Sequence, residues 1–212
     1  MSNSASPKRS RFALHTVIAG AVASLVLALG VSPTVSAFIA SIQNSTNTTG
    51  TGYLSMQEVS GANTCNSTDG GSISTNSATC ATINKYGGTA APLVPGGTQT
   101  TTVTVKNTGN VTANAFTLTP SACTQSNLGT PNGTATDLCS QITLNITSGA
   151  TTVYNGTLTA FSAPVNLVTV LGSTVAANAT VSFSFQVTLA SGAGNTYQGL
   201  QVSQPLTWAF SS

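Results

Sequence analysis

Length, composition and charge exclude some functions for this chain at the outset. It has 212 residues, of which 4% are charged and 40% are hydrophobic, and its formal net charge is +2. Three of the five basic residues lie within the first eleven positions. The remainder therefore has no basic patch that could neutralise phosphates, and we expect no nucleic-acid partner.

The first 37 residues have the features of a secretion signal peptide. A short basic region comes first and consists of Lys8, Arg9 and Arg11. An apolar stretch rich in Ala, Val and Leu follows over residues 12–31, and Val35-Ser36-Ala37 places small residues where a signal peptidase accepts them. We therefore expect signal peptidase to cleave the chain between Ala37 and Phe38.

A retained membrane anchor is the alternative interpretation of the apolar stretch, because about 20 apolar residues can span a bilayer. His15 within the stretch, the predominance of Ala over Ile and Leu, and the cleavage site after Ala37 favour removal instead. The sequence thus predicts a protein that is secreted to the extracellular space or the cell surface. It would contact the membrane only before the signal peptide is cleaved.

Removal of the signal peptide leaves 175 residues (212 − 37), which is enough for one domain with a full core. Two lysines and three carboxylates remain, so the net charge becomes 2 − 3 = −1. Thr, Ser, Asn and Gly supply the polarity of the surface instead. Such a surface fits a secreted β-domain in general, and it also fits a protein that packs against copies of itself.

The predicted secreted form begins with a potential β-strand. Residues 38–43 would extend about 20 Å as a strand, and residues 44–52 form a polar, flexible tether. We therefore divide the chain into a signal peptide (1–37), an N-terminal strand with its tether (38–52) and a β-sandwich domain (53–212). A tethered strand can pair with its own sheet or with the open edge of a neighbouring subunit, and these residues alone leave both possibilities open.

Four cysteines follow the signal peptide, and an even number in an exported protein predicts two disulfides. Three connectivities are possible. We favour Cys65–Cys80 and Cys123–Cys139, because each pair brackets a loop rich in Gly, Ser, Thr and Asn. Closing each loop would contribute about 3 kcal/mol in the chain-entropy model. A zinc site is disfavoured because the spacings are wide and no His follows position 15.

Alternation of apolar and polar residues with a period of two dominates the domain and predicts half-buried strands. The alternation is found at Val103 and Val105, over residues 181–189, and at Leu206, Trp208 and Phe210. Helical patterns are weak, because Thr, Val, Ser and Gly predominate. We therefore predict an all-β fold, a jelly-roll-like β-sandwich of about eight to ten strands, with long loops over residues 61–80 and 120–140.

Two turns are predicted from local sequence. Asn155-Gly156 is a typical type I′ turn and predicts a hairpin between residues 151–154 and 157–160, because both residues tolerate positive φ. Residues 106–110 form a second candidate turn, which would join residues 101–105 to residues 111–119.

The residues needed for common catalytic mechanisms are missing after position 37. No His remains there, which excludes Ser-His-Asp and Cys-His arrangements and His-ligated metals, and the predicted disulfides remove thiol nucleophiles. Glu58, Asp69 and Asp137 are the only carboxylates and lie in no recognisable motif. We expect no enzyme activity, and the sequence identifies no catalytic, metal-binding or cofactor-binding residue.

Three segments carry a resemblance to a known family. They are the junction Ala37-Phe38-Ile39-Ala40-Ser41-Ile42-Gln43 continuing to Gly52-Tyr53-Leu54, residues 103–113, and residues 195–208. In these segments the chain resembles surface proteins exported through SipW-type signal peptidases, the group that includes the TasA and camelysin-like proteins. The chain departs from TasA-like fibre proteins, which are longer and more charged and do not typically carry these disulfides.

The resemblance implies a jelly-roll fold and a role in extracellular fibres of the biofilm matrix. It also implies polymerisation by donor-strand exchange, in which the N-terminal segment of one subunit completes the sheet of the next. On this sequence the donor would be residues 38–43, with Phe38, Ile39 or Ile42 filling core positions of the neighbour. The implied partners are copies of the chain itself or related matrix subunits.

Two hypotheses about function follow. The first is a secreted structural surface protein, a fibre or biofilm-matrix subunit that assembles through its N-terminal strand. The alternative is a monomeric adhesin or glycan-binding β-sandwich module, with the loops at residues 61–80 and 120–140 as its binding face.

Overall fold

The computed structural model describes residues 41–212 of the chain. The predicted signal peptide, its cleavage site between Ala37 and Phe38, and Ile39 lie outside the described residues. The chain divides into two units, residues 1–49 and residues 50–212. The second unit contains every strand given below and is described by itself.

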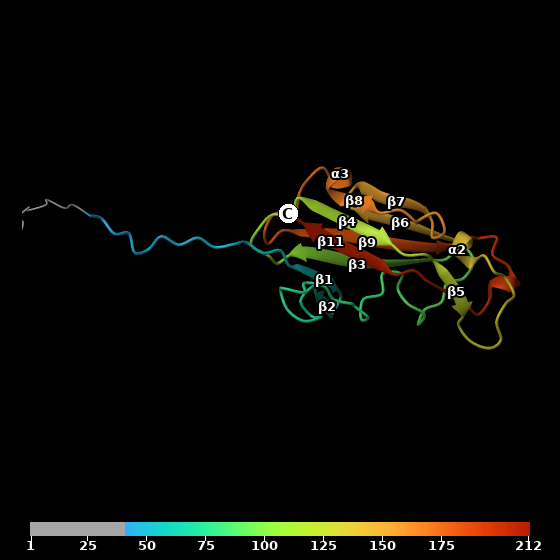
Figure 1. Cartoon of the computed structure of the whole chain (residues 1–212). Helices are drawn as coiled ribbons and strands as arrows, with labels where there is room; N and C mark the ends of the chain where they lie inside the picture. Colours follow the sequence, from blue (N-terminus) through green and yellow to red (C-terminus); the bar gives the residue numbers. More distant parts are fainter. Residues whose placement is uncertain (1–40) are drawn as a thin grey trace, which may run out of the picture. The chain divides into compact units, whose positions relative to one another are not determined.

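The larger of three sheets has six antiparallel strands in the order β2-β1-β3-β9-β6-β7 (Figure 1). The strands are β1 (Met56–Ser60), β2 (Asn63–Asn66), β3 (Thr98–Asn107), β6 (Ile142–Ser148), β7 (Thr151–Thr157) and β9 (Thr180–Leu189). The two ten-residue strands, β3 and β9, pair along nearly their whole length at the centre of this sheet.

The second layer consists of a three-stranded sheet, β11-β4-β8, and a two-stranded sheet, β10-β5. Its strands are β4 (Ala115–Pro120), β5 (Thr124–Asn127), β8 (Val165–Asn166), β10 (Leu200–Ser203) and β11 (Leu206–Ser211). The layer is interrupted between β4 and β5 and again between β10 and β11, at Pro120 and Pro205. Proline has no N–H for a ladder of hydrogen bonds, which explains an interruption at these positions.

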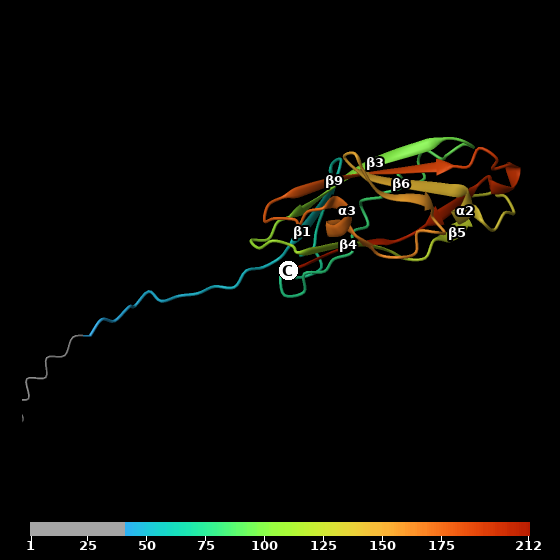
Figure 2. The same cartoon turned by 90° about the horizontal axis from the view of Figure 1, so that it is seen from above.

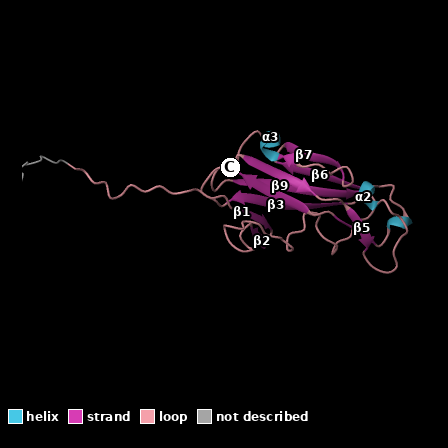
Figure 3. Ribbon diagram, viewed as in Figure 1, coloured by secondary structure: helices cyan, strands magenta, loops and turns pink. Residues whose placement is uncertain are grey.

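Helices are few and short in the described part of the chain (Figure 3). They are α2 (Leu138–Gln141), α3 (Leu167–Leu171) and the 3-10 helix Asn195–Tyr197. The Asn166 side chain caps α3 by accepting from the Thr169 N–H, and Gly172 ends it with a φ of 70°. None of these helices is long and apolar enough to cross a membrane.

The predicted fold class is confirmed, because the described residues form an antiparallel all-β sandwich. The chain changes layer repeatedly, from β3 to β4, β5 to β6, β7 to β8, β8 to β9 and β9 to β10. Residues 41–212 form eleven strands rather than eight to ten. Three short strands account for the difference, since β2 and β5 lie within the predicted loops and β8 has only two residues.

A cluster of aromatic side chains joins the two layers, which Figure 2 shows one above the other. Phe116 on β4 is fully buried, and its ring centroid lies 5.9 Å from that of Phe183 on β9. Trp208 and Phe210 on β11 lie 5.5 and 4.7 Å from Phe116. Phe183, Trp208 and Phe210 are inward-facing members of the alternating patterns found in the sequence, and Phe116 faces the same core.

The two layers have unequal widths. The strand β11 packs through Trp208 against Phe183 and Phe185 of β9, while α3, which follows β8, contacts β7. The three strands of the smaller sheet therefore lie opposite the β9 and β7 side of the larger one. No described strand covers the inner face of β1, and the residues that fill this space form the site analysed below.

The predicted hairpin at Asn155-Gly156 is wrong. Residues Thr151–Thr157 form one continuous strand, in which Asn155 pairs with Asn145 and Gly156 pairs with Leu144. The turn lies one strand earlier, between Ser148 and Thr151, and Gly149 has a φ of 56° there. Pairing with β6 extends through the Asn-Gly sequence, so tertiary contacts override its local turn preference.

The second candidate turn, at residues 106–110, connects two layers rather than two neighbours in one sheet. It leads from β3 in the larger sheet to β4 in the smaller one, and residues 111–114 form no strand. Asn107 fixes this connection from a fully buried position. Its amide donates to the carbonyls of Val111 and Val175, and its carbonyl accepts from the Gly109 N–H.

Both disulfides pair as the bracketed loops predict. Cys65 on β2 bonds to Cys80, and Cys123 before β5 bonds to Cys139 in α2. No cysteine of the described residues is free. Two disulfides are typical of proteins in an oxidising, extracellular environment.

The aromatic cluster should carry much of the stability of the domain. Replacing Phe116 by Ala is expected to lower the free energy of unfolding by about 3–5 kcal/mol, because it leaves a cavity between the layers. Val94→Ala is the matched control: Val94 is 67% exposed, so its truncation should change stability by no more than about 0.5 kcal/mol. The free energy of unfolding of both variants is measured by urea unfolding, followed by the fluorescence of Trp208, the single Trp of the chain. Equal effects would contradict this assignment of the core.

Candidate functional site

One edge of the smaller sheet is open in the described structure. Strand β11 pairs with β4 on one side and has no strand partner on the other. The Ser121 N–H donates to the Pro205 carbonyl, and hydrogen-bonded pairs alternate along an antiparallel ladder. The backbone groups of Leu206, Trp208 and Phe210 therefore face away from β4, toward the open side. A strand edge of this kind can accept another strand.

A groove of about 920 Å³ runs along β10 and β11. Its walls are formed by the start of β1, by the open edge of β11 and by residues 77–95, which we call the strap. The large apolar side chains that line the groove include Leu54, Met56, Ile83, Leu93, Leu206, Trp208 and Phe210. Among the described residues, two charged ones line it, Glu58 and Lys85.

The two charges form an ion pair inside the groove. Glu58 on β1 points to the inner face of the larger sheet, and its Oε1 lies 2.6 Å from Nζ of Lys85 in the strap. The side chains are only 9% and 10% exposed. Trp208 Nε1–H on β11 donates to the same Glu58 oxygen over 2.9 Å, and Lys85 Nζ lies 5.8 Å from the Trp208 ring centroid. Glu58, Lys85 and Trp208 thus connect β1, the strap and β11 next to the open edge of the second layer.

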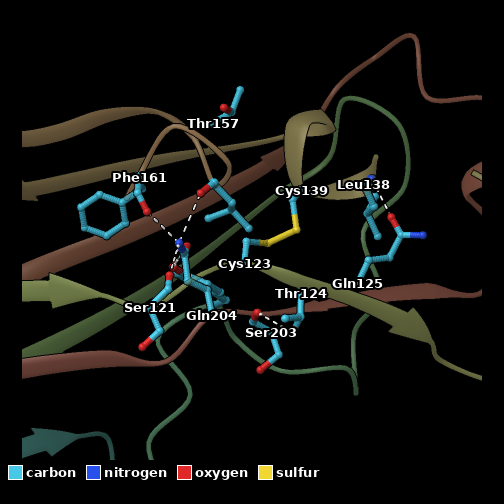
Figure 4. The surroundings of a disulfide bond; sticks show 12 residues. Ser121, Cys123, Thr124, Gln125, Leu138, Cys139, Thr157, Phe161, Ser203 and Gln204 are labelled. Atoms are coloured by element: carbon cyan, nitrogen blue, oxygen red, sulfur yellow. Dashed lines mark hydrogen bonds between the residues drawn. A yellow bond between two sulfur atoms is a disulfide. The ribbon is translucent and has the colours of Figure 1, made fainter. Parts of the chain in front are cut away.

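A second polar contact holds the strap next to the break between β10 and β11. The buried Gln204 accepts a hydrogen bond from the Tyr86 hydroxyl over 2.9 Å. The Gln204 amide donates to the carbonyls of Ser121, Leu158 and Phe161, as Figure 4 shows in part beside the Cys123–Cys139 disulfide. Burial raises the pKa of Tyr86 above its ordinary value, so the hydroxyl stays protonated and remains a donor.

The strap makes little backbone contact with the strands it covers. Between residues 77 and 95 the backbone hydrogen bonds are local, from Gly87 to Asn84 and from Gly97 to Val94. At one end Cys80 is bonded to Cys65, and just beyond the other end the Gly96 N–H donates to the Leu189 carbonyl. The strap is thus fixed at both ends and held in the middle by the side chains of Lys85 and Tyr86.

The N-terminal segment carries the other predicted site residues. Of the expected donor residues only Ile42 is described, and its side chain is 99% exposed. Residues 41–43 form no strand here, and every residue from 41 to 53 is exposed. The first anchor of the domain is the Tyr53 N–H, which donates to Asn110 Oδ1 over 2.7 Å.

The two loops expected to form an adhesin face lie apart. Residues 67–76 contact the start of β1 through Ser67 and Asn76. The other loop, through Gly133 and Ala135, is bonded to Gln198 and Thr196 at the far end of the sandwich (Figures 1 and 2). Residues from both loops nevertheless line the groove, among them Ser77 and Cys80 of the first loop and Leu128 and Leu138 of the second.

The carboxylates have different neighbours. Glu58 pairs with Lys85, Asp69 accepts from Asn66, and Asp137 accepts from Tyr197. This last hydrogen bond is the main cause that raises the pKa of Tyr197. Among residues 41–212 no three side chains of His, Cys, Asp or Glu gather as a metal site would require.

Sequence reasoning missed the roles of Lys85, Tyr86 and Gln204 in the site. A usable signal existed only for Glu58, which follows Met56 by two residues and so falls on an inward-facing strand position, where an unpaired charge is costly. Its partner, Lys85, lies 27 positions further along the chain. Local patterns could not identify it, because the segment around it has no periodicity.

The ion pair should be strongly coupled. Lys85→Met leaves the Glu58 carboxylate buried without a compensating positive charge, and we expect it to lower the free energy of unfolding by about 3–5 kcal/mol. Adding Glu58→Gln should restore a large part of that loss. Lys106→Met removes a lysine that forms no ion pair in the described structure and serves as the control. Urea unfolding of the unaltered chain, of each single variant (Lys85→Met and Glu58→Gln) and of the double variant gives the coupling energy. Additive single effects would show that the pair is not coupled.

No protein-family model matches this chain, and no curated protein is similar to it at a significant level.

Proposed function

We propose that the protein is a secreted structural surface protein, a fibre or biofilm-matrix subunit that polymerises by donating its N-terminal strand to the next copy. The single observation that carries the proposal is the open edge of β11 with an apolar groove along it. The occupant we propose is residues 38–43 of a second copy of the chain.

The dimensions of donor and acceptor support this assignment. Residues 38–43 match in number the six residues of β11, and both would span about 20 Å. An added strand would pair with the outward backbone groups of Leu206, Trp208 and Phe210. Main-chain hydrogen bonds would thus supply affinity along the whole groove.

The chemistry of the two segments is also complementary. Residues 38–43 are uncharged, with three large apolar side chains, Phe38, Ile39 and Ile42. Apart from the Glu58–Lys85 pair the groove is uncharged, and large apolar side chains line it. Residues 44–52 are polar and exposed, as a tether between subunits requires. Burial of the donor side chains would drive assembly.

A charge placed in the donor strand should prevent assembly without affecting the fold. Ile42→Asp would bury an unpaired carboxylate in the groove, and we expect at least a tenfold loss of polymer. Gln43→Asp is the matched control, because neighbouring strand residues point to opposite faces. Negative-stain electron microscopy of the chain beginning at Phe38 measures polymer, and circular dichroism checks the fold. Equal polymer from Ile42→Asp and the unaltered chain would contradict the proposal, as would absence of polymer from the unaltered chain.

Hydrogen exchange should locate the acceptor edge by its alternation. In the polymer the amides of Leu206, Trp208 and Phe210 are expected to gain protection from exchange. Thr207 and Ala209 face β4 and should be protected before and after assembly, so they serve as internal controls. Residue-resolved exchange by NMR, quenched from monomer and from polymer, makes the comparison. Protection that appears on β7 or β2 and not on β11 would assign the acceptor elsewhere.

A further inference from the structure

The strap lies beside the open edge of β11. Lys85 and Tyr86 are the central residues of a turn, which the Gly87 N–H closes by donating to the Asn84 carbonyl. From this turn Lys85 lies over Trp208, and Tyr86 reaches Gln204. It makes no backbone hydrogen bond to β10 or β11. An edge that is covered in this way is shielded from solvent without being paired.

A donated strand and the closed strap compete for the same space. The strap and β11 line one groove, and the Lys85 Nζ reaches over the Trp208 ring, 5.8 Å from its centroid. The Tyr86 hydroxyl donates to Gln204, two residues before β11 begins, over 2.9 Å. A strand that pairs with the outward groups of β11 would also make backbone hydrogen bonds, which the strap does not make.

We propose that the strap is a latch, which covers the acceptor edge in the free subunit and must move outward before a strand can be accepted. This inference rests on the proposed function. The Glu58–Lys85 and Tyr86–Gln204 contacts hold the latch closed, and the Cys65–Cys80 bond together with the anchor at Gly96 limits its movement. The latch would keep newly exported subunits from pairing with unrelated strands.

Trypsin provides a direct measure of the latch. Residues 38–212 contain only two cleavage sites, Lys85 and Lys106. Lys85 is 10% exposed in the closed strap. Lys106 lies in β3, paired with both β1 and β9, so it serves as an internal control. The experiment uses the chain beginning at Phe38 with Ile42→Asp, so that its own donor strand is disabled. The probe is a synthetic peptide of residues 38–47 with a fluorophore at its end.

If the latch opens when the peptide binds, cleavage after Lys85 should become at least tenfold faster while Lys106 stays intact. Peptide binding itself is measured by fluorescence anisotropy. If the peptide binds and cleavage after Lys85 is unchanged or slower, the strap stays closed over the strand. That outcome overturns the latch while the acceptor groove stands. If the peptide does not bind, the proposed function fails and the latch fails with it.

A matched pair of variants tests the Tyr86 contact separately. Tyr86→Phe removes only the hydroxyl that donates to Gln204, and it should speed cleavage after Lys85 several-fold without peptide. Tyr154→Phe removes a hydroxyl that donates to the Thr157 carbonyl; Tyr154 does not line the groove and makes no hydrogen bond with Gln204, so the change should have no effect. Equal cleavage rates for these two variants would overturn the role of Tyr86 in holding the latch.

Discussion

The structure of this domain depends on the unequal widths of its two layers. Six strands lie opposite a sheet of three, and a β-sheet is stable only when its apolar face is covered. The inner face of β1 is covered by the strap instead of a strand. Since the strap offers side chains but no backbone pairing, this region can include a charged pair. Glu58 is tolerated there because Lys85 and Trp208 both meet its carboxylate.

A second constraint acts where the smaller layer is interrupted. Pro120 and Pro205 cannot donate to a ladder, so the chain needs other groups to hold the halves together. The side-chain amide of Gln204 does so. It donates to the carbonyls of the residues just after β4 and β7, and it accepts a hydrogen bond from Tyr86 of the strap. The Cys123–Cys139 bond fixes α2 next to the same interruption. The interruption, the strap and the open edge are thus parts of one arrangement.

Much of the sandwich follows from local sequence, because the inward residues of β3, β9 and β11 alternate with a period of two. The disulfide pairing follows too, since each pair closes a loop short enough to be recognised. The hairpin predicted at Asn155-Gly156 is wrong because pairing with β6 outweighs the turn preference of these two residues. The candidate site was beyond such reasoning. The strap has no periodicity, and the contacts of Lys85 and Tyr86 join residues brought together only by the fold.

The scarcity of charge in the domain has a consequence for where it can work. Dissolved salt screens exposed charges that are farther apart than the Debye length, about 8 Å at physiological ionic strength, while it affects buried pairs much less. The one ion pair of the described residues lies under the strap, nine-tenths hidden from solvent. Cohesion here comes from apolar burial and neutral hydrogen bonds. A domain built in this way should keep much the same stability in dilute buffer and in concentrated salt, because few of its stabilising contacts are open to ionic screening.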